Sequence, residues 1–74
     1  MPAPAVGERL WRARKNHTWI DAQLRTPAAS TFELQCFYDG GLVFTRTWTT
    51  REAAMAHADA LLRELQRAGW NTHW

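Results

Sequence analysis

Residues 42–70, LVFTRTWTTREAAMAHADALLRELQRAGW, contain the change of pattern that decides the fold. Up to Trp48, apolar side chains alternate with polar ones, as they do in a half-buried β-strand. From Thr49 onward, apolar residues recur every three or four positions, which is the spacing of one face of an α-helix. The sequence therefore predicts a strand that ends near residue 48 and a helix that follows it directly.

The predicted helix has signals at both ends. Thr49 and Glu52 have the spacing of a capping box, in which the hydroxyl accepts from a first-turn N–H and the glutamate reaches back. Gly69 suits the left-handed residue after a helix, and Trp70 suits a Schellman motif in which it packs on Leu65. We expect about 18 helical residues, about 27 Å long. One apolar stripe comprises Ala54, Met55, Ala58, Leu61, Leu62, Leu65 and Ala68.

Four strand-like segments precede the helix. Their residues are 8–15, 18–25, 31–38 and 42–48, and they are separated by a turn at 16–17, a loop at 26–30 and a turn at 39–41. The first segment has the weakest pattern, because Leu10 faces one way while Trp11 and Ala13 face the other. The third segment alternates most regularly between apolar and polar residues.

The length of the last turn sets the register of the hairpin around it. A three-residue loop at 39–41 would pair Cys36 with Phe44, Phe32 with Trp48 and Tyr38 with Leu42, which gathers the apolar side chains on one face. A two-residue loop, Asp39-Gly40, would slip the strand by one residue and invert the faces. We therefore expect the longer loop. Arg46 then lies opposite Leu34 and must extend to the rim of the sheet.

These elements predict an α+β fold, a four-stranded antiparallel β-meander followed by one C-terminal α-helix packed on one sheet face. We expect a disordered lead-in at residues 1–7, a single domain at 8–70 and a C-terminal tail at 71–74. One helix covers one face of such a sheet, so the other face is left for solvent, a partner or a ligand.

Charge and aromatic content suggest what that face could bind. The 74-residue chain carries a net charge of +2 and five tryptophans. Residues 8–25 hold a net charge of +3, whereas the rest of the chain holds −1. Single-strand binders use cations to follow phosphates and flat rings to stack bases. The resulting candidate nucleic-acid-binding residues are Arg12, Arg14, Lys15, Trp19, Arg25 and Phe37.

Two interpretations without nucleic-acid binding also explain these residues. Edge strands often carry Lys and Arg simply because these residues suppress aggregation between sheets. Exposed rings such as Trp11, Trp19, Phe37 and Trp74 could instead be buried in a homodimer, or Trp11 and Trp74 could cover the rims of the monomer core. The alternative function is therefore a homodimeric protein-interaction or regulatory module with no role in nucleic-acid binding.

Other classes of function find little support in the sequence. His17, His57 and His73 lie far apart, with no spacing typical of a metal site, and no cofactor is expected. Cys36 lies mid-strand among apolar residues, so we expect an inert buried thiol and no enzyme. A single cysteine is typical of a reducing compartment, and residues 1–7 do not resemble a signal peptide. We expect a cytoplasmic protein that does not cross a membrane.

Two families share features with the chain. The order of four strands and a helix resembles the single-stranded-DNA-binding transcriptional coactivator domain, a dimer that binds through its basic sheets; the resemblance covers most of the chain and concerns element order only. Residues 45–48, the following helix and Gly69-Trp70 are similar to a WGR-type DNA-associated domain. The Trp-Gly-Arg signature is absent, since Trp48 is followed by two threonines. No functional residue is carried over from either family.

Overall fold

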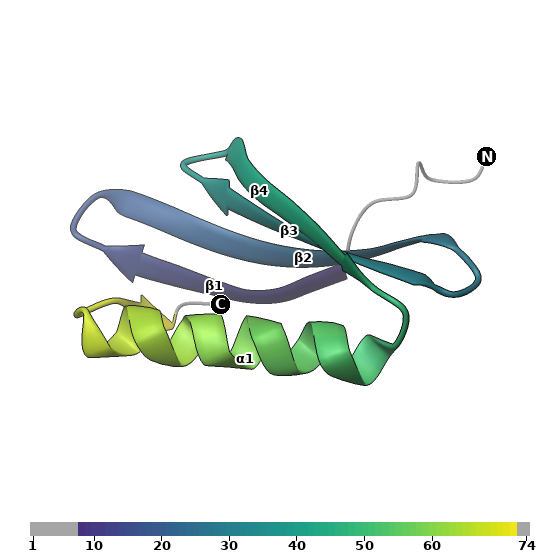
Figure 1. Cartoon of the computed structure of the whole chain (residues 1–74). Coiled ribbons are helices and arrows are strands. Elements are labelled where there is room, and N and C mark those ends of the chain that lie inside the picture. Colours follow the sequence, from purple (N-terminus) through teal and green to yellow (C-terminus); the bar gives the residue numbers. More distant parts are fainter. Residues whose placement is uncertain (1–7, 73–74) are drawn as a thin grey trace.

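A computed structural model describes residues 8–72 of the chain, and the expectations for residues 1–7, His73 and Trp74 lie outside this range. The elements are β1 (Glu8–Lys15), β2 (Thr18–Ala28), β3 (Thr31–Tyr38), β4 (Gly41–Trp48), α1 (Arg51–Arg67) and β5 (Asn71–Thr72). They form one antiparallel sheet in the order β4-β3-β2-β1-β5, with α1 on one face (Figure 1). The predicted α+β architecture is confirmed.

The fifth strand was not predicted. Residues 71 and 72, which the sequence analysis assigns to a tail, pair with Arg14 and Ala13 of β1. A two-residue strand has no periodicity that a sequence can display. It forms because the end of α1 brings the chain back to the open edge of β1.

The last hairpin satisfies two requirements that the sequence analysis treated as exclusive. Asp39 and Gly40 have φ angles of 49° and 84°, so the turn has two residues and not the expected three. Such a turn matches the twist of the strands. Tyr38 consequently pairs with Gly41, and Val43 is an extra residue in β4 that forms a bulge. The bulge restores the predicted pairing of Cys36 with Phe44.

The helix begins one residue later than predicted. Thr50, not Thr49, is the N-cap, and its hydroxyl accepts from the N–H of Ala53 at 3.2 Å. Glu52 is then the second helical residue and cannot close a capping box, although it lies in the first turn where the helix dipole favours a carboxylate. At the other end the Schellman motif is confirmed, because the N–H of Trp70 donates to the carbonyl of Leu65 at 3.0 Å.

The core lies between α1 and the half of the sheet that contains β1, β2 and β3. Trp11 is 2% exposed, and its indole Nε1 donates to the carbonyl of Ala58 at 3.1 Å. This buried tryptophan settles the question of whether Trp11 belongs to the core. The remaining buried residues are Ala13, Ala22, Leu24, Leu34, Cys36, Ala54 and Ala58. Alanines on both α1 and the sheet allow their backbones to approach closely.

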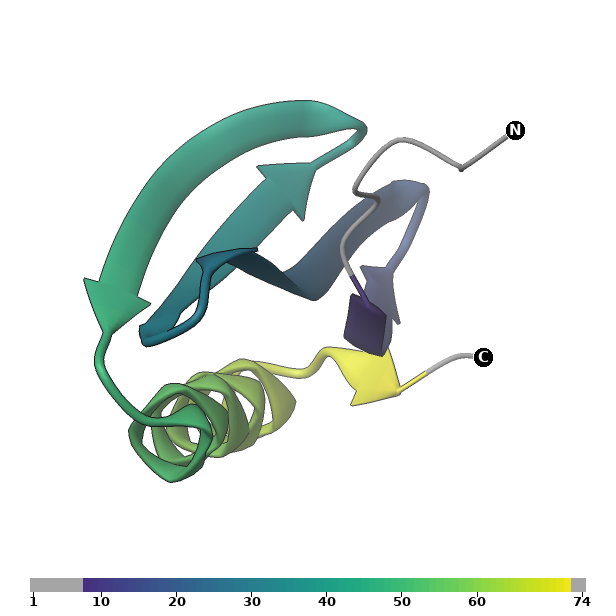
Figure 2. The same cartoon turned by 90° about the vertical axis from the view of Figure 1, so that its right-hand side faces the viewer.

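The fourth strand is only partly covered. β4 approaches α1 at the residue 49–50 connection and diverges from it toward the β3–β4 turn, as both views show (Figures 1 and 2). Accordingly Phe44 and Trp48 are half-buried, whereas Leu42 and Val43 are exposed. Arg46 lies opposite Leu34, is exposed, and has its guanidinium carbon 5.8 Å from the centre of the Trp48 ring.

Candidate nucleic-acid interface

The sheet face opposite α1, called the outer face below, is built by cross-strand pairs. Arg14 pairs with Trp19 and Arg12 with Asp21 across β1 and β2. The same face continues through Asp21–Phe37, Gln23–Gln35 and Arg25–Glu33, and through Gln35–Thr45 and Glu33–Thr47. Because alternate residues of a strand point to opposite faces, these side chains project away from the core.

Two arginines gather around the ring of Trp19. The guanidinium carbon of Arg12 lies 4.2 Å from the ring centroid, and that of Arg14 lies 5.1 Å from it. Both distances are within the range of a cation–π interaction. The β1–β2 register produces this cluster, since Arg14 lies directly opposite Trp19 and Arg12 lies diagonally from it. We call Arg12, Arg14 and Trp19 the arginine–tryptophan cluster.

An ion pair holds one member of this cluster in place. Nε of Arg12 lies 3.0 Å from Oδ1 of Asp21, and a guanidinium nitrogen of Arg9 lies 4.0 Å from the other carboxylate oxygen. The Nε and Oδ1 atoms are buried but do not meet the angular requirement of a hydrogen bond. Arg12 and Asp21 are therefore linked by electrostatic attraction and not by a directional hydrogen bond. The pair also neutralises part of the positive charge of the outer face.

The structure separates two of the six candidate residues from the cluster. Lys15 faces the helix side, where its Nζ donates to the carbonyl of Ala68 at 2.8 Å, at the C-terminal end of α1. Arg25 does lie on the outer face, but its guanidinium donates to Glu33 at 3.2 Å. It is also six residues from Trp19 along β2, about 20 Å away. A continuous basic strip through all six residues is therefore not present.

Phe37 is the second aromatic residue of the outer face. It lies opposite Asp21 in β2 and opposite Leu42 in β4 and is half-buried. Trp19, two residues before Asp21, is consequently its diagonal neighbour. The outer face therefore has an aromatic and apolar end near the β3–β4 turn. Its opposite end is polar and contains the Arg25–Glu33 pair.

Asp39 is a residue that the sequence analysis treated only as part of a turn. Its carboxylate accepts from the backbone N–H of Trp19 at 2.9 Å, and its own N–H donates to the carbonyl of Trp19 at 2.9 Å. These two bonds tie the β3–β4 turn to the start of β2. No periodic signal could have revealed this, because the contact joins residues 20 positions apart.

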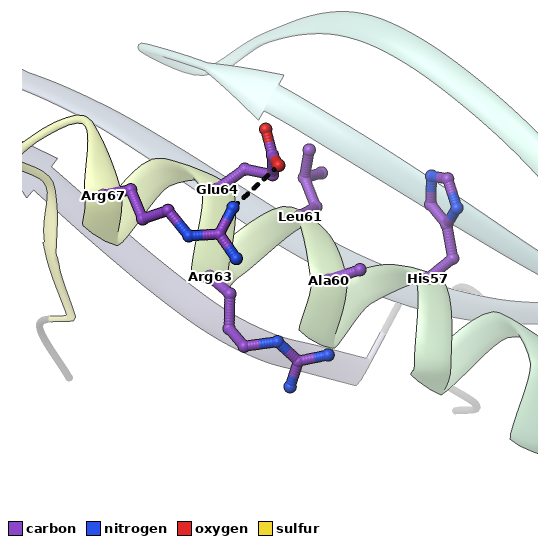
Figure 3. Close-up of a pocket in the computed structure, with 6 residues that line it drawn as sticks. All are labelled: His57, Ala60, Leu61, Arg63, Glu64 and Arg67. Carbon is purple, nitrogen blue, oxygen red and sulfur yellow. Dashed lines mark hydrogen bonds and ion pairs between the residues drawn. The ribbon is translucent and has the colours of Figure 1, made fainter.

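A shallow hollow of about 320 Å³ opens beside α1. Figure 3 shows the side chains that line it, all from this one helix: His57, Ala60, Leu61, Arg63, Glu64 and Arg67. Glu64 accepts from Arg67 at 3.1 Å, and both side chains are largely exposed. A ligand pocket normally encloses its ligand between several elements. This hollow lacks such enclosure, and we assign it no ligand.

Reactive and metal-binding groups do not converge elsewhere in residues 8–72. The His57 ring lies 5.0 Å from the ring of Trp48 and is held on the helix flank. Burial, with a smaller effect of the Asp21 charge, raises the pKa of the Cys36 thiol from 9.0 to about 11. The described residues contain no cluster of three His, Cys, Asp or Glu side chains suited to a metal ion. None of their helices is long and apolar enough to span a bilayer.

Comparisons with protein-family models, with curated proteins and with solved structures find no match to this chain.

Proposed function

We propose that the chain is a non-catalytic binding protein that holds single-stranded nucleic acid on its outer face. The observation that carries this proposal is the arginine–tryptophan cluster, in which two guanidinium groups lie within about 5 Å of one indole ring on the uncovered side of the sheet. Bases stack both on aromatic rings and on guanidinium planes. Phosphates are bound by the N–H groups of the same arginines.

The geometry suggests how the strand would lie. One base would stack on the layer formed by Arg12 and Trp19, and a neighbouring base would stack on Phe37. Arg14, whose Nε donates to the carbonyl of Asn16 at 3.0 Å, retains further N–H groups that could donate to a phosphate. Asp39 would hold Trp19 in position for stacking, because it bonds to both the backbone N–H and the carbonyl of that residue.

Charge on this face is modest, so the expected salt dependence is modest too. Arg9, Arg12, Arg14 and Arg25 are opposed by Asp21 and Glu33. The net charge of +2 corresponds to neutralisation of about two phosphates. For single strands this predicts affinity that falls about sevenfold between 50 and 200 mM salt.

Fluorescence anisotropy of a labelled single-stranded oligonucleotide tests the proposal. The double variant Arg12→Ala/Arg14→Ala removes both cations of the cluster and should weaken binding at least tenfold. Its matched control is Arg63→Ala/Arg67→Ala, which removes the same charge from exposed positions of α1 and should leave binding near that of the unsubstituted chain. Equal affinity of the two double variants would contradict the proposal.

The second candidate is a homodimeric interaction module, and one observation favours it. Tyr38, Leu42 and Val43 are the large apolar residues that residues 8–72 leave exposed, at 44%, 53% and 58%. All three flank the β3–β4 turn. Exposed apolar side chains that gather at one place are typical of an interaction site. Light scattering on the free chain tests this candidate directly.

We also propose a cytoplasmic location. The support is Cys36, which is buried and, as the single cysteine of the sequence, has no second cysteine to pair with. Reducing compartments maintain such thiols.

A further inference from the structure

The strand β4 has an unpaired main-chain edge. It is the terminal strand of the sheet, and no other segment of residues 8–72 pairs with the edge that points away from β3. At the opposite side of the sheet, β5 pairs with Ala13 and Arg14 and so covers part of the edge of β1. An eight-residue strand with free N–H and C=O groups is a template for the addition of another strand.

The side chains of β4 discourage most such additions. Arg46 lies on the inner, apolar face, opposite Leu34, and an inward-pointing charge is costly to cover with an apolar residue of an added strand. The bulge at Val43 also interrupts regular pairing. A strand that joins β4 must therefore place something other than an aliphatic side chain against Arg46. A second copy of the chain meets this requirement, because β4 itself carries the half-buried aromatic residue Phe44 next to Thr45.

We propose that the partner is a second copy of the chain, with β4 pairing antiparallel to β4 of the partner subunit about a two-fold axis at Thr45. In this register Thr45 lies opposite Thr45 of the partner subunit, and Arg46 lies opposite Phe44 of the partner subunit. The guanidinium group can then lie on the ring of a partly buried phenylalanine, which is a cation–π contact. Cross-strand threonine pairs are also favourable.

Neighbouring registers fail for identifiable reasons. A two-fold axis perpendicular to the sheet must pass midway between a residue and its own copy, because paired residues point to the same face. An axis at Arg46 places two like charges opposite each other, which is destabilising. An axis at Phe44 brings Arg46 opposite Leu42 of the partner subunit, but the bulge at Val43 turns Leu42 to the outer face, so Arg46 gains no partner on the inner face. An axis at Thr47 extends the pairing into residues 49 and 50, where the chain leaves the sheet.

The same pairing also covers exposed apolar surface. It brings Val43, which is 58% exposed, close to Thr47 of the partner subunit at the margin of the new contact, where the bulge ends the regular ladder. Two-fold pairing uses the long free edge of both copies and therefore closes as a dimer and not as a fibre. Because each copy contributes one strand, the contact is small, and we expect a micromolar dissociation constant.

Cysteine cross-linking tests both the dimer and its register. Residues opposite each other in an antiparallel ladder have Cα atoms about 4.5–5.5 Å apart, within the range that a disulfide requires. Thr45→Cys should therefore form a disulfide-linked dimer when diamide accepts the two electrons of the thiols. The matched control is Thr47→Cys, on the same strand and also exposed. Its two copies would lie about 14 Å apart along the strands and should not cross-link.

The native cysteine does not obscure this measurement. Cys36 is 4% exposed and has a pKa raised to about 11, so the thiol stays protonated and covered at pH 8. Light scattering without oxidant should show a mass that rises toward twice 8.6 kDa as the protein concentration increases to about 500 μM. This concentration exceeds the micromolar dissociation constant that we expect for a small interface. Thr45→Lys should return the chain to a monomer, because it places two ammonium groups at the axis.

Three results would overturn the proposal: a monomer at every concentration, a dimer that neither cysteine variant cross-links, and cross-linking of Thr47→Cys but not of Thr45→Cys. The inference does not depend on nucleic-acid binding. The Arg12→Ala/Arg14→Ala variant should still dimerise, and the Thr45→Lys monomer should still bind a short oligonucleotide. Failure of one proposal is therefore distinguishable from failure of the other.

Discussion

The strands β1 and β4 are both eight residues long, yet their surroundings differ sharply. β1 has neighbours on both sides and contributes Trp11 and Ala13 to the core, with exposures of 2% and 0%. β4 has one neighbour and no fully buried residue. The difference shows that a single helix of 17 residues covers part of a twisted sheet and leaves the remainder exposed.

The largest expected effect that tests this comparison is the loss of Trp11. Trp11→Ala removes a fully packed ring and its hydrogen bond to Ala58, and we expect a loss of about 3–5 kcal/mol in the free energy of unfolding. Leu42→Ala in β4 is the matched control and should change that free energy by less than about 0.5 kcal/mol. Urea denaturation measures both. Similar losses would mean that β4 is covered as well as β1.

Cys36 locates the boundary between the two regions, because it lies on β3 opposite Ala22 on one side and Phe44 on the other. Its folded-state pKa of about 11 exceeds the ordinary 9.0, so folding favours the protonated thiol. The resulting stabilisation is fully present below pH 9 and is lost as the pH rises to 11. The expected loss is about 2–3 kcal/mol.

Denaturation at pH 8 and at pH 11 checks this prediction. The comparison is made with Cys36→Ala, which retains every other ionisable group of the chain. The variant should lose less stability than the unsubstituted chain over the same pH interval. An identical loss in both proteins would mean that water reaches the inner face of the sheet beside β4.

The smallest effect concerns a cation that belongs to the covered region. Lys15 donates to the carbonyl of Ala68 at the C-terminal end of α1, where a positive charge interacts favourably with the helix dipole. Lys15→Met should cost about 0.5–1 kcal/mol at low salt, and less at high salt. Arg46→Met removes an exposed cation of β4 that caps no helix. The free energy of unfolding that Arg46→Met loses should not depend on salt in the same way. If salt changed the loss equally in both variants, Lys15 would not act on the helix dipole.

The candidate site was only partly predictable. Alternation along two strands was enough to place Arg12, Arg14 and Trp19 on one face, and the register then brought them together. Lys15 was grouped with them because it is adjacent in sequence and basic, but it lies on the same side of β1 as Trp11 and Ala13 and faces the helix. Alternation also placed Arg25 correctly on the face of Trp19, but its pairing with Glu33 depends on a neighbouring strand. The hydrogen bonds of Asp39 to Trp19 could not be predicted from the sequence, because the two residues are distant along the chain.

The sequence by itself determined the elements, their order and the apolar faces, because period, turn residues and helix-ending signals act over a few residues and can be read locally. The tertiary structure decided the rest. It placed the cap at Thr50, inserted a bulge at Val43, recruited residues 71–72 as a strand and buried Trp11. Each of these outcomes depends on how close separate elements approach in space. That distance is set by packing around Ala54 and Ala58 and by the twist of the sheet. The spacing of residues along the chain predicts neither of these.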